Sequence, residues 1–147
     1  MSAEDNKARV RRFYDEVCNG RNPAVAHELF APEFVYHEPP SISPGGTGPA
    51  AIAEEAATYY RAFSDAQWIV HDVVAGENDT VTVRWTGQGT HDGDLAGIPP
   101  TGKHISVEAL ALFQLRDGKI VELWEVWDAL ALMQQLGVVP TPGQAGA

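Results

Sequence analysis

The spacing of apolar residues in this chain changes at Asp65. Before this residue, apolar side chains recur every three or four positions, as at Val10, Phe13 and Val17, which is the spacing of one face of an amphipathic helix. After it, apolar and polar residues alternate in runs rich in Val, Ile, Thr and Trp, which is typical of strands. Helices followed by a run of strands predict an α+β domain, with the helices on one face of an antiparallel sheet.

Three helices are expected in the first half of the chain, with a short strand before the third. The helices are predicted at residues 4–19, 23–30 and 49–63, and the strand at 34–36. Gly20 ends the first helix, and Asn22 followed by Pro23 is a favoured start for the second. The segment 38–49 is dense in Pro, Gly and Ser and is expected to be a loop.

Four long antiparallel strands are expected in the second half. They are predicted at residues 67–75, 80–90, 103–116 and 119–127. Asp117-Gly118 predicts a tight hairpin turn between the last two, because such a turn needs positive φ at both central residues. The segment 92–102 is too rich in Gly and Pro for a strand and is expected to be a long connection that can serve as a lid. A last helix is expected at 129–136, closing one end of the sheet.

These elements predict a single domain over residues 1–147, with 139–147 as a flexible tail. A curved sheet of four long strands and one short strand would wrap around the three N-terminal helices and form a cone with an internal pocket. The formal net charge is −10 and the basic residues are scattered, so nucleic acid is not an expected partner. No apolar run is long enough to cross a membrane and the N-terminus lacks a signal-peptide pattern, so we expect a cytoplasmic protein.

Three segments of the second half match a known pattern. They are VTVRWTGQGTHDGDLAGIPPTGK at 81–103, DGKIVELWEVWD at 117–128 and LMQQLG at 132–137. With them the chain, from its first helix to Leu136, resembles the SnoaL-like polyketide cyclases, a branch of the cone-shaped domains related to ketosteroid isomerase. The resemblance implies cofactor-independent ring closure of a polyketide by intramolecular aldol condensation. It also implies one aspartate as the acid/base group, at Asp128, a substrate contact at Tyr14, and a polar residue near Gln114 on the preceding strand.

Asp128 is also a candidate on physical grounds. If the strand alternates regularly, Asp128 shares a face with Trp124 and Val126, and on a concave face its carboxyl would lie in apolar surroundings that favour the protonated form. Such a carboxyl can take a proton from a carbon acid and return it to an oxygen. The alternative is that Asp128 caps the helix that starts at Ala129, because Asp before an apolar run is a favoured N-cap.

Further residues are candidates for contact with a ligand. His37 follows the short strand and is the second candidate catalytic residue, because an imidazole titrates near neutral pH and can assist protonation of a carbonyl. His91 enters the expected lid. Tyr14, Tyr59 and Tyr60 have the helical spacing of an inner face, and Trp85 and Trp124 are further aromatic candidates for the cavity wall. The resemblance adds Gln114 to this substrate-binding set. No His pair with metal-ligand spacing, phosphate-binding glycine loop or G-x-S-x-G elbow occurs, so neither a metal nor a cofactor is expected.

Three functions fit these patterns. The first is an acid/base enzyme acting on a hydrophobic, polycyclic carbonyl compound. The most specific reaction of this kind is cyclisation of a polyketide ester. The second keeps the fold but catalyses isomerisation, dehydration, epoxide opening or hydroxylation, because fold does not fix function. The third is a domain that binds a small hydrophobic molecule without turning it over. A homodimer is expected, because residues 105–115 are apolar on both faces of their strand.

Overall fold

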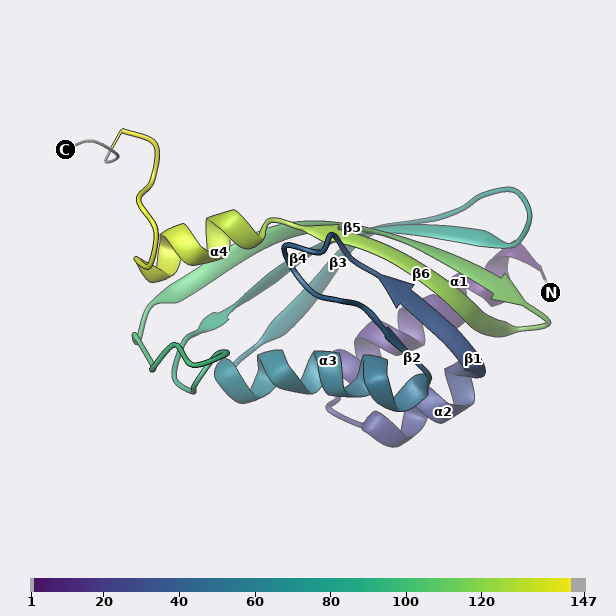
Figure 1. The fold of residues 1–147 in the computed structure, drawn as a ribbon. Helices are drawn as coiled ribbons and strands as arrows, with labels where there is room; N and C mark the ends of the chain where they lie inside the picture. Colours follow the sequence, from purple (N-terminus) through teal and green to yellow (C-terminus); the bar gives the residue numbers. More distant parts are fainter. Residues whose placement is uncertain (1, 144–147) are drawn as a thin grey trace.

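A curved six-stranded sheet with helices on its concave side forms the body of the molecule (Figure 1). The computed structural model describes residues 2–143. The strands are β1 (Phe30–His37), β2 (Gly46–Thr47), β3 (Gln67–Ala75), β4 (Thr80–Thr90), β5 (His104–Arg116) and β6 (Lys119–Trp127). Their order in the sheet is β2-β1-β6-β5-β4-β3. The α+β class and the curved sheet over helices are confirmed, and the sheet remains open.

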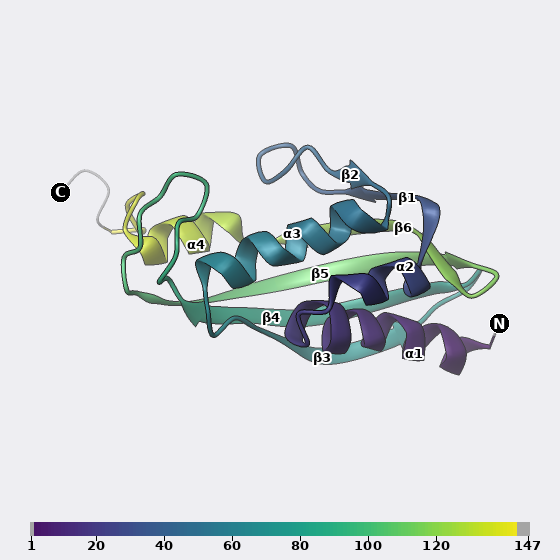
Figure 2. The same cartoon turned by 90° about the horizontal axis from the view of Figure 1, so that it is seen from below.

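The helices pack under the sheet in the order that the spacing predicts. They are α1 (Ala3–Arg12), η1 (Phe13–Asn19), η2 (Pro23–Val25), α2 (Ala26–Leu29), α3 (Pro49–Ala62) and α4 (Ala129–Leu136). From below, α1 runs beneath β3 and β4 while α3 lies beneath β5 (Figure 2). The first predicted helix continues past Arg12 as a π-helical segment, and Gly20 then ends it. A Cβ at Gly20 would lie 2.6 Å from the Glu16 carbonyl oxygen, which no larger residue allows without a shift.

Two strands differ from the predicted pattern. The short strand near Val35 is longer than expected, because β1 already begins at Phe30 and pairs in parallel with β6. The predicted loop contains β2, which pairs with β1 through Val35 and Tyr36. The predicted hairpin at Asp117-Gly118 is confirmed, with φ of 50° and 77° at these two residues. The expected tail is described only as far as residue 143, so the prediction for residues 144–147 lies outside the described part.

An irregularity in the pairing of β5 with β6 decides which side chains face the helices. Gln114 pairs with Glu122, but its neighbour Leu115 pairs with Ile120, so β6 has one extra residue at this point. Ile120 and Leu123 are therefore both buried although they are three residues apart. Beyond the irregularity the strand alternates regularly, and Leu123, Glu125 and Trp127 lie on its inner face.

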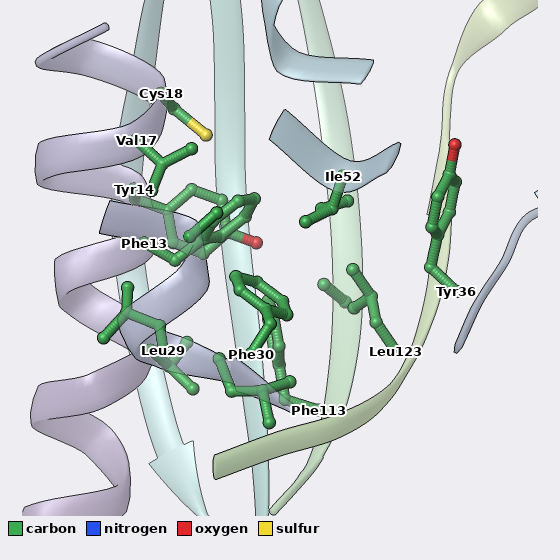
Figure 3. Packing of buried hydrophobic residues seen from close by; sticks show 14 of the residues in the cluster. Phe13, Tyr14, Val17, Cys18, Leu29, Phe30, Tyr36, Ile52, Phe113 and Leu123 are labelled. Carbon is green, nitrogen blue, oxygen red and sulfur yellow. The ribbon is translucent and has the colours of Figure 1, made fainter. Parts of the chain in front are cut away.

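The main core lies between the N-terminal helices and the sheet (Figure 3). The ring of Phe13 packs edge-on against Phe30 and Phe113, with centroids 5.2 and 6.1 Å away. Such edge-to-face pairs stabilise beyond the area they bury. A second cluster, which includes Phe63, Ile105 and Leu132, fills the end of the sheet next to α4. An open space between these two clusters is where the site lies.

The connection between β4 and β5 is held against the end of α3. The backbone N–H groups of Asp92 and Gly93 donate to the carbonyl oxygen of Ala62 at 3.1 and 2.9 Å. The Asp92 carboxylate also accepts from the backbone N–H of Ser64 at 2.9 Å. This segment thus closes the second core cluster beside α4. Within residues 2–143 no helix is long and apolar enough to cross a membrane.

Candidate functional site

A pocket of about 720 Å³, counting its open mouth, lies between the inner face of the sheet and the helices η1 and α3. Its walls are mostly aromatic and aliphatic, with few polar groups. They are formed by Phe13, Tyr14, Cys18, Ile52, Glu55, Ala56, Tyr59, Phe63, Ala66, Gln67, Trp68, Trp85, Gly87, Gln88, Ile105, Val107, Glu125, Trp127 and Leu132. An apolar cavity with a few convergent polar groups is the usual form of a small-molecule site.

Glu125 is the acidic group of the pocket that the strand β6 supplies. Burial raises the pKa of its carboxyl to about 8, and the negative charges of Glu38 and Glu55 act in the same direction. The indole N–H of Trp85 lies close enough to lower this pKa slightly, yet it makes no hydrogen bond of normal geometry. Near neutral pH the group can therefore exist in either protonation state, as acid/base catalysis requires.

Two buried donors face the same region without a partner. The hydroxyl of Tyr14 and the Nε1–H of Trp85 make no hydrogen bond, although Tyr14 is only 1% exposed. Figure 3 shows the Tyr14 hydroxyl directed from η1 toward the space beside Ile52 of α3. Leaving a buried donor unpaired costs roughly 1–3 kcal/mol. A ligand oxygen in the pocket would remove that cost.

A second acidic group lies on the α3 side of the pocket. Glu38 follows β1 and Glu55 belongs to α3, and their side chains are hydrogen-bonded to each other. Burial, followed by the charge of Glu55, raises the pKa of Glu38 to about 7, and burial also raises the pKa of Glu55. The Nε1–H of Trp127 donates to Glu38 Oε2 at 2.9 Å. The hydroxyl of Tyr36 donates to Glu55 Oε2 at 3.3 Å.

The arrangement suits proton transfer within an apolar cavity. Two acidic groups of raised pKa, Glu55 and Glu125, line the cavity, and two unpaired donors, Tyr14 and Trp85, line it as well. Enolate chemistry needs a group that accepts a proton from carbon and donors for the oxygen that becomes negative. Among the residues that the structure describes, no group of three or more His, Cys, Asp or Glu side chains could hold a metal ion.

Three of the residues predicted to bind substrate line the pocket. Tyr14 contributes from η1, Tyr59 from α3 and Trp85 from β4. The ring of Tyr59 stands edge-on to Trp127 with the centroids 5.6 Å apart, so the two rings form one aromatic wall. Burial raises the pKa of the Tyr59 hydroxyl, which therefore remains a neutral donor.

Asp128 lies outside the pocket, at the N-terminus of α4. Its Oδ1 accepts from the backbone N–H of Ala131 at 2.9 Å, which is the N-cap arrangement considered as the alternative. The inward position predicted for it required the strand face of Trp124 and Val126 to be the concave one, and that face is the outer one. Trp124 is 42% and Val126 58% exposed, because the extra residue in β6 turns this set of side chains outward.

His37 and Trp124 meet on the outer face of the sheet rather than in the pocket. Their rings stack with centroids 5.4 Å apart. His37 Nε2 also lies 2.6 Å from Glu122 Oε2, and both side chains are partly exposed. The candidate catalytic histidine therefore pairs with a surface carboxylate.

The other three predicted contacts also lie away from the pocket walls. Gln114 donates to the carbonyl oxygen of Asn78 at 2.7 Å and so holds the turn between β3 and β4. The ring of Tyr60 packs under the guanidinium of Arg21. His91 is fully buried at the base of the β4–β5 connection, where its Nδ1 accepts from the backbone N–H of Thr101 at 3.1 Å.

The acidic residues of the pocket were missed at the sequence level. Glu55 could have been found, because it lies at i+3 from Ile52 and i−4 from Tyr59, both of which face inward. Regular alternation from the buried Ile120 would put Glu125 on the outer face. The extra residue in β6 moves it to the inner face, so the sequence alone could not identify it. Glu38 lies in a segment without periodicity, and no pattern indicated it.

Comparison with known proteins gives consistent results. The family model of the SnoaL-like polyketide cyclases matches residues 8–136. The aklanonic acid methyl ester cyclase DauD of Streptomyces sp. (strain C5) is 30% identical over 141 residues, covering 90% of this chain and 83% of its own. DnrD of Streptomyces peucetius, also an aklanonic acid methyl ester cyclase, is 30% identical over 141 residues and covers 90% of this chain and 92% of its own.

Solved structures share the fold. A SnoaL-like protein of Jannaschia sp. CCS1 superposes with a TM-score of 0.81 and 25% identity, over 93% of this chain and 94% of that one. AclR of Streptomyces galilaeus, described as a candidate hydroxylase, also gives a TM-score of 0.81 at 25% identity, over 95% of this chain and 85% of its own.

Substitution of Asp128 should show whether this residue caps α4 or acts as the acid/base group. Asp128→Ala removes the cap of α4 and should lower the free energy of unfolding by about 1 kcal/mol, measured by urea denaturation. Asp128→Asn should keep nearly full stability, because Asn is also a good N-cap, and it should keep turnover of whatever substrate the wild type converts. A stable Asp128→Asn protein without turnover would restore this residue as the acid/base group.

Glu125 should make stability depend on pH. In the folded protein its pKa is about 8 against an ordinary value of 4.5, so the unfolded chain releases this proton first as the pH rises. The wild type should therefore lose stability between about pH 5 and pH 8. The slope should be at most about 1.4 kcal/mol for each pH unit, and water in the pocket would make it smaller.

Glu125→Gln should remove the loss of stability with rising pH that the Glu125 carboxyl causes. The variant should match the wild type at pH 5 and exceed it at pH 9 by on the order of 2–4 kcal/mol in urea denaturation. Equal stabilities at both pH values would show that the carboxyl is not desolvated.

Proposed function

Because this chain belongs to the SnoaL-like polyketide cyclase family, we propose that its pocket closes a ring in a polyketide ester by an intramolecular aldol reaction, with Glu125 as acid/base group. The observation that carries the proposal is the partly buried Glu125 carboxyl, which lines a mostly apolar cavity and whose pKa is raised by desolvation. Relatives named as aklanonic acid methyl ester cyclases support the substrate class.

In this proposal the ionised form of Glu125 takes a proton from a carbon next to a carbonyl group. The resulting enolate oxygen is negative and needs hydrogen-bond donors in a site that excludes water. The Tyr14 hydroxyl and the Trp85 indole N–H are buried and unpaired, so they can donate to this oxygen without first giving up another bond. Carbon–carbon bond formation then closes the ring.

The walls of the pocket fit a flat, polycyclic substrate. Tyr59 and Trp127 form one aromatic wall, and Phe13 and Trp85 contribute further rings. Aromatic side chains bury large apolar areas and pack well against planar ring systems. These rings would hold the chain of the substrate folded, so that the reacting carbons are near each other before the proton is removed.

The desolvated acid argues against a domain that only binds. A purely hydrophobic ligand gains nothing from a buried carboxyl, and that carboxyl lowers stability at neutral pH. The likeness to AclR keeps hydroxylation on this fold as the second candidate activity. Turnover of a polyketide ester without an added oxidant would separate cyclisation from that alternative.

Glu125→Gln should slow ring closure of aklanonic acid methyl ester by about 10²–10⁴-fold, because general acid–base catalysis contributes roughly this factor. Product formation by liquid chromatography measures the effect. The matched control is Glu122→Gln on the same strand, whose carboxylate pairs with His37 on the outer face and should leave the rate unchanged. Equal rates for wild type and Glu125→Gln would remove Glu125 from the mechanism.

We also propose that the outer face of the sheet joins two copies of the chain. Large apolar side chains are exposed there on neighbouring strands, with Leu110 and Val126 paired across β5 and β6 at 57% and 58% exposure. Trp124 and Leu112 extend the same patch. Contiguous exposed apolar surface of this kind is typical of an interface.

Leu110→Lys should therefore shift the protein from dimer to monomer in sedimentation velocity experiments, since a charge would be buried at the contact. Ala50→Lys, at the exposed start of α3 under the concave face, is the control and should stay dimeric. A wild type that sediments as a monomer at all concentrations would contradict the interface.

A further inference from the structure

The Glu38–Glu55 pair has a geometry for which the proposed function gives no role. Glu55 lines the pocket, whereas Glu38 reaches it from the segment after β1 and is hydrogen-bonded to Glu55. Each carboxyl also has its own fixed donor. Trp127 Nε1 donates to Glu38 and the Tyr36 hydroxyl donates to Glu55. Both side chains are thus oriented by three different elements, β1, β6 and α3.

A hydrogen bond between two carboxyls requires a proton on one of them, since two carboxylates have no donor. The groups that face the pair are Tyr36, Tyr59, Trp127 and Glu125, which are neutral or acidic. None of the groups that act on the pKa values of Glu38 and Glu55 is a cation. Like charges at contact distance cannot both form, so the pair retains one shared proton near neutral pH.

We propose that the Glu38–Glu55 pair is the general acid of the ring closure and delivers its shared proton to the oxygen of the acceptor carbonyl. This rests on the proposed function, and it assigns separate groups to the two ends of the reaction. Glu55 is the catalytic residue, because it lines the pocket, and Glu38 is a positioning residue that carries the shared proton in the resting pair and supplies it through its hydrogen bond to Glu55. Tyr14 and Trp85 serve the enolate oxygen, which is a different atom.

The proton and electron balance closes without a co-reactant. Glu125 takes the proton from the nucleophilic carbon, and that carbon forms a bond to the acceptor carbonyl carbon. The π electrons of the carbonyl move to its oxygen, which takes a proton from Glu55 and becomes a hydroxyl, while the shared proton passes from Glu38 to Glu55 to replace it. The pair is then doubly anionic, and its mutual repulsion favours uptake of the proton now on Glu125, directly or through water. The protein returns to its starting state, and the product is an isomer of the substrate.

The decisive experiment measures proton abstraction and ring closure in one reaction. Aklanonic acid methyl ester is incubated with enzyme in deuterium oxide, and mass spectrometry follows deuterium in the recovered substrate, above the rate without enzyme, together with the cyclised product. Glu55→Gln should lower ring closure by about 10²-fold or more while enzyme-dependent deuterium uptake persists. Glu125→Gln should lose both.

Matched variants make the result specific. Glu38→Gln should also slow closure while keeping deuterium uptake, since its amide can still accept from Trp127 but cannot share a proton as a carboxyl does. Glu54→Gln, beside Glu55 on the exposed face of α3, should behave as wild type. Unchanged closure in Glu55→Gln, or equal loss of uptake and closure, would overturn the proposal. Circular dichroism and urea denaturation confirm that each variant is folded.

A second measurement does not depend on turnover. Carbon NMR of protein labelled at the Glu side-chain carboxyls should show Glu38 and Glu55 titrating in two separated steps, the later one near neutral pH. Glu38→Gln should reduce this to one step. If the wild type converts no polyketide ester, the proposed function fails while this titration still tests the pair. Two carboxyls that titrate together in the ordinary range would contradict the shared proton.

Discussion

The pairing of β6 with β5 beyond Glu122 determines which side chains enter the pocket. One extra residue between Ile120 and Glu122 places Leu123, Glu125 and Trp127 on the concave side. Without it, the side chains now inside would point outward, because a shift of one residue reverses both faces of a strand. Bulges occur often beside active sites for this reason. The acid, its aromatic wall and the outer apolar patch all follow from this one irregularity.

The pocket keeps groups that a stable core would not contain. Glu125 is desolvated, Tyr14 and Trp85 have unpaired donors, and Glu38 lies against Glu55. Each of these costs free energy that the edge-to-face aromatic cluster around Phe13 helps to offset. Strain and unsatisfied polar groups of this kind collect at functional sites, where the ligand supplies the missing partners. Of the buried polar side-chain atoms without a hydrogen bond in the described residues, those of Tyr14 and Trp85 line this cavity, whereas Asn6 Oδ1 and His91 Nε2 lie elsewhere.

Local sequence signals predicted most of the fold, and three of the seven predicted substrate contacts lie on the pocket wall. The spacing of apolar residues, the turn residues and the helix end at Gly20 identified the helices and the long strands. These elements could be predicted because each of these signals depends only on residues a few positions apart in the sequence. Tyr14, Tyr59 and Trp85 followed from the same rules. Asp128 and Trp124 were misplaced, since a register irregularity is a property of two paired strands and cannot be read from one of them. Glu38 depends on a loop path that no periodicity describes.

The charge of the pocket bears on which form of a substrate it would accept. Its lining residues, among those that the structure describes, include Glu55 and Glu125 and no Lys, Arg or His. A free carboxylate would have no counter-ion here and would lose its hydration next to groups that already resist ionisation. A methyl ester carries the same carbonyl chemistry without the charge. The raised pKa values that suit Glu125 and the Glu38–Glu55 pair to proton transfer therefore also favour a neutral ester over the corresponding acid.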